Sequence, residues 1–242
     1  MRNALLTLTA AALLQGSAMA QELVFVAPTN HTEPMAQFGS GDQLQGGILK
    51  DIGDRLAQRL NLRARYLPAP SRRVSETLRK GEADLVCYVL PGWLEGEFRW
   101  TVPVLPNAEV VAARPEMPSI QRLDDLQGQQ VGTVIGYGYT HLLAEPSLPL
   151  PFVRQDALSS RSNLDKLAAG RMGYAITEEL TLRDYVQRHP ESRLRVALTV
   201  ARYTAQCAQS KQSRLDFEAI NQQLGAMVRE GEITRILARY GS

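Results

Sequence analysis

Short apolar runs alternate with segments of helical hydrophobic spacing along most of this chain, and the alternation occurs twice. The first round predicts a strand, a helix, a strand, a helix and a strand, over Glu22–Ala27, Ile48–Leu60, Leu62–Leu67, Ser71–Lys80 and Ala83–Leu90. Such an order favours a mainly parallel sheet covered by helices on both faces. The fold class is therefore predicted to be α/β.

A second round follows a charged, proline-containing stretch at residues 114–119. Strands are predicted over Gln130–Ile135, Phe152–Val153 and Met172–Ile176, helices over Tyr139–Ala144, Ser159–Ala169 and Glu178–Arg188, extended segments over Leu194–Leu198 and Tyr203–Ala208, and closing helices over Arg214–Arg229 and Glu232–Arg239. The closing helices follow a strand that can return to the first sheet. We therefore expect two lobes joined by two crossover strands, with a ligand cleft between them. Residues 21–110 and 201–242 are expected to form lobe 1, and residues 111–200 lobe 2.

The first 20 residues have the pattern of a signal peptide. Arg2 precedes an apolar run, Ala4–Leu14, and Ala18-Met19-Ala20 offers small residues for cleavage before Gln21. The run is too short to span a bilayer, which needs about 20 apolar residues. A soluble periplasmic protein is expected after cleavage; a buried N-terminal helix is the alternative interpretation.

The remaining 222 residues (242 minus 20) are close to electrically neutral. The chain has 27 Lys and Arg against 25 Asp and Glu, and removal of Arg2 leaves 26 against 25. The basic residues are scattered, without the long block that a nucleic-acid backbone favours, so no nucleic-acid partner is expected. We expect a monomer.

Five motifs in the same order resemble those of the extracellular solute-binding protein family 3, the type II periplasmic binding proteins of amino-acid ABC transporters. They lie at residues 46–57, 78–85, 100–103, 123–136 and 167–176. Residues 123–136 (LDDLQGQQVGTVIG) match the opening of the family's second lobe closely. The resemblance covers nearly all of the chain after residue 20.

The resemblance implies a non-enzymatic protein that captures a small polar, carboxylate-bearing ligand between two lobes. It also implies an inner-membrane ABC permease as the partner, and no cofactor. Two alternatives stay open: a periplasmic sensing or accessory module, and a lyase or dehydratase on the same fold. Because His31, His141 and His189 lack metal-ligand spacing, no metal site is expected either.

Several departures from the family's pattern affect the expected ligand contacts. The arginine that holds an α-carboxylate is absent from residues 93–97, and Arg72 or Arg73 before the second helix is the substitute that we expect. Glu178 corresponds best to the acidic residue that receives an α-amino group. Tyr88 and Trp93 lie where strands of lobe 1 end, and both are expected to contact ligand. The alternatives are a solvated helix start for the arginines, a first-turn acid for Glu178 and a loop anchor for Trp93.

A glycine-containing turn, Gly136-Tyr137-Gly138-Tyr139-Thr140, follows a predicted strand and opens a predicted helix. Free N–H groups and the positive end of a helix dipole favour an anion there. The resemblance implies that this turn holds a carboxylate, with the tyrosines beside the ligand. A plain tight turn is the alternative. A dinucleotide site is not expected, because His141 takes the place of the third glycine.

The two cysteines of the chain are Cys87 and Cys207. In an oxidising compartment two cysteines are expected to pair. The type II order implied by the resemblance places the strand of Cys207 antiparallel to that of Cys87, and a disulfide between them is therefore predicted. Two separate buried thiols are the alternative.

Overall fold

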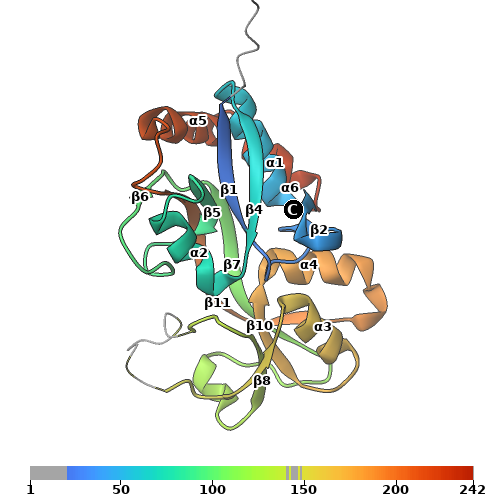
Figure 1. The fold of residues 1–242 in the computed structure, drawn as a ribbon. Helices are drawn as coiled ribbons and strands as arrows, with labels where there is room; N and C mark the ends of the chain where they lie inside the picture. Colours follow the sequence, from blue (N-terminus) through green and yellow to red (C-terminus); the bar gives the residue numbers. More distant parts are fainter. Residues whose placement is uncertain (1–20, 140–141, 143–146, 148, 242) are drawn as a thin grey trace, which may run out of the picture.

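The protein is described here from a computed structural model that covers residues 21–139, 142, 147 and 149–241 (Figure 1). The strands are β1 (Glu22–Pro28), β2 (Gln37–Phe38), β3 (Leu44–Gly46), β4 (Arg63–Ala69), β5 (Leu85–Val89), β6 (Arg99–Trp100), β7 (Leu105–Ala113), β8 (Gln130–Val134), β9 (Val153–Ala157), β10 (Tyr174–Glu178) and β11 (Arg195–Gln209). The helices are α1 (Ile48–Arg59), α2 (Ser71–Arg79), α3 (Ser160–Ala168), α4 (Glu179–Arg188), α5 (Phe217–Arg229) and α6 (Glu232–Ala238). This order follows the alternation predicted from the sequence.

Helix α1 illustrates how local sequence sets an element. Ile48, Ile52 and Leu56 recur at helical spacing and are fully buried, because this face packs in the core beside β4. The helix begins after Gly47, whose φ is +103°. A Cβ at that position would stand 2.7 Å from the carbonyl oxygen of Met35, so only glycine fits.

One sheet of nine strands runs through the molecule in the order β4-β1-β5-β11-β7-β10-β8-β9, with β6 beside β11. β1 is parallel to β4 and β5, and β8 is parallel to β9 and β10. β11 is antiparallel to both β5 and β7, and β7 is antiparallel to β10. β7 and β11 are therefore the two strands that join the halves of the sheet.

The two halves of the sheet form two lobes (Figure 1). Alternate residues of β1 point to opposite faces of the upper lobe: Phe25 packs in the core on the side of α1, α5 and α6, and Val24 packs on the side of α2. In the lower lobe α3 and α4 cover one face. On the other face, within the described residues, the 3₁₀ helix η2 (Leu123–Leu126) and loop residues pack against the sheet. The two-lobed α/β fold is confirmed, and the residue boundaries of the lobes stay a prediction.

Strand β11 differs from the prediction of two separate extended segments. Thr199, Ala201 and Arg202 lie between those segments and pair with β7, so the strand continues for 15 residues. Its apolar pattern is interrupted by Thr199 and Arg202, and only the pairing with β7 reveals the continuity. β9 likewise extends to Ala157, well beyond the predicted Phe152–Val153. The helix predicted over Tyr139–Ala144 lies mostly outside the described residues.

The predicted disulfide between Cys87 and Cys207 is present. Cys87 in β5 and Cys207 in β11 face each other in an antiparallel pair, as the resemblance implied. The bridge spans a sequence separation of 120 residues. Because that separation contains the whole lower lobe, the bridge ties together the points where the chain leaves and re-enters the upper lobe.

No helix within the described ranges is both long and apolar enough to cross a membrane.

Candidate functional site

Strand ends from both lobes meet at the boundary between them. In the upper lobe Asn30 and His31 follow β1, and Tyr88 lies near the end of β5. In the lower lobe Tyr137 follows β8, and Glu178 ends β10. The carboxyl ends of parallel strands are where open α/β sheets bind ligands. We call the polar and aromatic residues gathered here the interlobe cluster: Asn30, His31, Tyr88, Trp93, Tyr137, Glu178 and Tyr203.

Tyr88 has an unusual backbone. Its φ is +68°, in the left-handed region that a bulky residue rarely adopts. Cys87 pairs with Cys207 and Val89 pairs with Gln206, so Tyr88 is the extra residue of a β-bulge. Bulges re-aim side chains, and the ring of Tyr88 is buried, with an exposed fraction of 3 %. Backbone strain of this kind concentrates at functional sites.

The rings of the interlobe cluster pack edge to face. The ring centroids of Trp93 and Tyr203 are 5.5 Å apart, and those of Tyr88 and Trp93 are 6.5 Å apart. The imidazole of His31 lies 5.4 Å from the ring of Tyr88. Trp93 is 37 % exposed, so its ring offers a surface on which a ligand could stack.

Glu178 is the acidic residue of the interlobe cluster. Its carboxylate accepts hydrogen bonds from the hydroxyls of Ser160 (3.1 Å) and Thr177 (3.4 Å). It forms no salt bridge within the described part of the chain. A half-buried carboxylate without a cationic partner favours a cation, because the attraction is stronger away from bulk water.

The electrostatics of the cluster reflect burial and the Glu178 carboxylate together. Burial raises the pKa of the Tyr88, Tyr137 and Tyr203 hydroxyls, and the negative charge of Glu178 raises each further. Burial lowers the pKa of His31, while Glu178 acts in the opposite direction without overcoming it. The tyrosines are therefore neutral donors and acceptors at neutral pH.

The glycine-containing turn leaves β8 with Gly136 at a φ of +83° and open space around it. Arg154 holds the turn by donating to the carbonyl oxygens of Tyr137 (3.1 Å) and Val134 (3.2 Å). Tyr137 reaches the lobe boundary, where its hydroxyl accepts a hydrogen bond from Asn30. Tyr139 instead points into the lower lobe, where its hydroxyl accepts the N–H of Val134 at 2.8 Å. The exposed Gly138 lies in this turn, and Thr140 lies outside the described residues.

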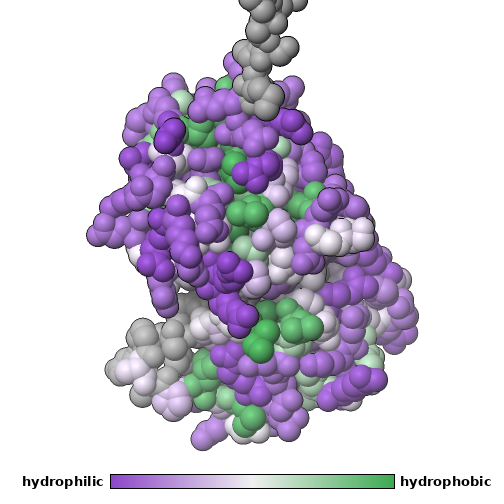
Figure 2. Space-filling view, in the orientation of Figure 1, coloured by the Kyte–Doolittle hydropathy of each residue, from purple (hydrophilic) through white to green (hydrophobic). Residues whose placement is uncertain are grey.

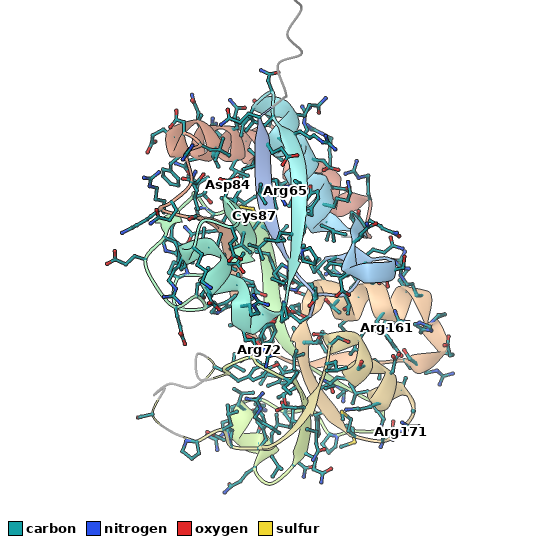
Figure 3. All side chains as sticks on the ribbon, in the orientation of Figure 1. Arg65, Arg72, Asp84, Cys87, Arg161 and Arg171 are labelled. Carbon is teal, nitrogen blue, oxygen red and sulfur yellow. A yellow bond between two sulfur atoms is a disulfide. The ribbon has the colours of Figure 1, made fainter. Side chains whose placement is uncertain are left out.

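Arg72 and Arg73 are exposed in the first turn of α2. Figure 3 places Arg72 at the end of α2 that is nearest the lower lobe. Neither arginine forms a salt bridge in the described ranges. Both cations are therefore available at the rim of the lobe boundary, without direct contact with the interlobe cluster.

Contacts across the boundary bring the two lobes together. The side chain of Asn30 donates to Tyr137 and accepts a hydrogen bond from Ser71 at the start of α2. Glu33 of the upper lobe pairs with Arg161 of α3, with 3.8 Å between the charged atoms. The bond from Asn30 to Tyr137 and the ion pair of Glu33 with Arg161 therefore hold the two lobes against each other.

Two apolar side chains lie beside the polar cluster. Ile135 and Leu158 follow the neighbouring parallel strands β8 and β9 and are 57 % and 79 % exposed. The N–H of Ile135 bonds to Ala157, which keeps the two strand ends together. Figure 2 shows apolar surface near the upper edge of the lower lobe, within a mostly polar face. An apolar part of a ligand could rest on such residues.

A groove of about 730 Å³ lies elsewhere, between α1 and α6. Its charges are already paired, since Arg55 binds Glu232 at 2.6 Å and Arg239 binds Asp51 at 2.8 Å. We therefore place the candidate site at the interlobe cluster. No three metal-ligating side chains of the described segments gather in a group that could hold a metal ion.

Sequence reasoning missed several residues of this region: Asn30, His31, Ser71, Asn107, Ser160 and Tyr203. They come from segments that are far apart in the chain, and none lies in a motif. The positions of His31 and Asn30 directly after the first strand were the available signal.

No protein-family model matches this chain, and no curated protein matches it. Solved structures do. An ancestral arginine-binding protein bound to arginine superposes with a TM-score of 0.73 at 18 % identity, covering 93 % of this chain and 100 % of that one. An amino-acid ABC transporter substrate-binding protein from Streptococcus pneumoniae, bound to L-arginine, gives 0.72 at 17 % identity, covering 90 % and 94 %. A histidine kinase sensor domain similar to periplasmic binding proteins gives 0.74 at 16 % identity, covering 91 % and 96 %.

These similarities extend over nearly the whole of each chain. At such low identity they establish the fold alone, which is that of the two-lobed periplasmic binding proteins. Function has to be argued from the interlobe cluster.

Proposed function

We propose that this chain is an exported solute-binding protein that holds a small polar ligand between its two lobes. The observation that carries the proposal is Glu178, a half-buried carboxylate among aromatic rings that has hydrogen bonds but no salt bridge in the described residues. A ligand ammonium group would complete this site by charge pairing and by contact with the rings.

The ligand that fits best also carries a carboxylate. The glycine-containing turn lies on the lower lobe with open space around Gly136, and Arg72 and Arg73 offer cations on the upper lobe. Together with Glu178 they favour an amino-acid-like zwitterion. Trp93, Tyr88 and Tyr137 would contact its remaining surface.

Transport is the role that we propose. After removal of the signal peptide the protein would work in the periplasm and present its closed form to an inner-membrane ABC permease. Ligand would be released to the permease unchanged, so we infer no enzymatic activity. A sensing role is the second candidate, because a histidine kinase sensor domain shares the fold. Neighbouring genes for a permease and an ATPase would support transport.

Native mass spectrometry of freshly purified protein tests the proposal. We expect a co-purified small molecule that is recovered unchanged, and calorimetry with that molecule gives its affinity. Small-angle scattering should show a smaller radius of gyration with saturating ligand. If a panel of amino acids and small carboxylates neither binds nor changes the radius, the proposed function is wrong.

A matched pair of variants locates the site. E178Q removes the carboxylate of the interlobe cluster, and E179Q makes the same change one residue later, where the side chain instead faces Arg183 and Arg202. Loss of a charge-assisted bond costs about 1.5–3 kcal/mol. We therefore expect a roughly 10- to 150-fold loss of affinity for E178Q and a small change for E179Q.

A further inference from the structure

The side chain of Asn107 lies where the two lobes and both crossover strands meet. Its Nδ2 donates to the hydroxyl of Tyr88 at 2.6 Å. Its Oδ1 accepts the N–H groups of Ala108 (2.8 Å) and Leu180 (3.3 Å). Tyr88 belongs to β5 of the upper lobe, and Leu180 belongs to α4 of the lower lobe. A single amide on β7 therefore bonds to both lobes.

The bond to Leu180 caps α4 from a distant strand. The first N–H groups of a helix have no partner within it, and Glu178, the residue before α4, provides no side-chain cap. Asn107 supplies that cap from β7. Because Glu178 directly precedes the helix, the cap also fixes the carboxylate that we assign to ligand binding.

The same amide sets the direction of the next hydrogen bond. Since Oδ1 receives two N–H groups, Nδ2 is the atom that faces Tyr88, and the Tyr88 oxygen must accept. The hydroxyls of Tyr88 and Tyr203 are 2.7 Å apart. Among the described residues, the Tyr203 oxygen is the one acceptor within hydrogen-bond distance of the buried Tyr88 hydroxyl. Donation from Tyr88 to Tyr203 therefore satisfies the Tyr88 hydrogen and leaves the hydrogen of Tyr203 for another acceptor.

We propose that Asn107 is a positioning residue that caps α4 beneath Glu178 and directs the Tyr88–Tyr203 pair so that Tyr203 is a donor at the lobe boundary. The group that accepts the Tyr203 hydrogen is either Glu178 or a polar group of the bound ligand. Only the second of these rests on the proposed function. Asn107 and Tyr203 also face each other on β7 and β11, so strand pairing holds the relay in place.

Replacing the amide by a carboxylate separates the two roles. N107D keeps an oxygen for the N–H of Leu180, but its second oxygen accepts where Nδ2 donated. Tyr88 would then donate to that oxygen, and Tyr203 would donate to Tyr88, which reverses the relay. N107A removes both roles. N221D is the matched control, because Asn221 uses its Oδ1 to accept the N–H of Val102 in the upper lobe.

Both roles can be measured on the full chain without ligand. Amide hydrogen exchange at Leu180 should be roughly 2- to 10-fold faster in N107A and no faster in N107D or N221D, as expected for one neutral hydrogen bond. NMR of protein labelled at the tyrosine ¹³Cζ should show the Tyr203 signal moving in N107D and staying in place in N221D. Spectra of Y88F and Y203F assign the signals.

The double variant N107D/Y88F separates relay reversal from the direct field of the new charge. With the Tyr88 hydroxyl removed the relay is cut, so the displacement of the Tyr203 signal should largely vanish. An equal displacement with and without that hydroxyl would overturn the relay, and wild-type exchange at Leu180 in N107A would overturn the cap. Neither result depends on the ligand screen, so failure here is distinguishable from failure of the proposed function.

Discussion

Removal of the disulfide between Cys87 and Cys207 should destabilise the protein more than any other change of similar size. The variant C87A/C207A leaves two small apolar side chains in place of the bridge. Cys207 is fully buried, so alanine is preferable to serine, which would bury an unpaired hydroxyl. The variant therefore tests the cross-link with little added polar cost.

The magnitude follows from the loop that the bridge closes. With a sequence separation of 120 between the cysteines, the chain-entropy model gives about 5 kcal/mol at 25 °C. Loss of native disulfides typically costs about 2–5 kcal/mol, so the entropic figure is an upper value. With a urea m value of about 3 kcal/mol/M, the unfolding midpoint should fall by roughly 1–2 M.

Urea unfolding of wild type and variant, each with and without a reductant, provides the assay. Reductant should lower the wild-type midpoint toward that of C87A/C207A and leave the variant unchanged. Thiol titration of the unfolded, unreduced wild-type protein should find no free thiol. The reasoning is refuted if the unfolding midpoint of the wild-type protein is the same with and without reductant, or if the oxidised protein has two reactive thiols.

Three further predictions concern the lobe boundary. The ligand identified by mass spectrometry should bind roughly 10- to 150-fold more weakly to R72A or to R73A, each measured by calorimetry. If both variants bind it as tightly as wild type, neither arginine is a cationic anchor. N30A removes a bond to Tyr137 and another to Ser71, so small-angle scattering of ligand-free protein should show a larger radius of gyration than wild type. Burial lowers the pKa of His31, so the unfolded state binds its proton more readily and the free energy of unfolding should fall as the pH drops below about 6.5. In urea titrations between pH 7 and 5, the free energy of unfolding of H31Q should depend less on pH than that of wild type. An unchanged slope would mean that other groups cause the pH dependence.

The sequence predicted the fold well because its main elements are defined locally. Helix α1 has buried residues at helical spacing and a glycine at its start, and α3 has Ser159 as an N-cap that accepts the N–H of Ser162 at 3.2 Å. Strand β11 was divided into two because its polar residues conceal the pattern. Its continuity depends on pairing with β7, which is a long-range contact that no local window contains.

The site was predicted in part for a similar reason. Tyr88 was predicted from its place at a strand end, Tyr137 from the glycine-containing turn, and Glu178 from the resemblance to the solute-binding family. Asn107 and Tyr203 lie within the crossover strands, where the apolar pattern of the sequence predicts which residues are buried but not which hydrogen bonds they form. Their roles come from hydrogen bonds between residues 19 and 115 positions apart in the chain, and a single sequence gives no sign of them.

The disulfide and the relay meet at Tyr88, and this links stability to the proposed function. Because Cys87 is held opposite Cys207, and Val89 pairs with the next residue, Gln206, the extra residue of the bulge has to be Tyr88. A shift of one residue would move the tyrosine ring to the other face of the sheet. The bridge therefore fixes the register that aims Tyr88 at Asn107. A left-handed backbone conformation is unfavourable for a buried tyrosine, and it persists only where the surrounding structure imposes it. Here the disulfide holds the neighbouring Cys87, and Asn107 holds the Tyr88 hydroxyl by a hydrogen bond.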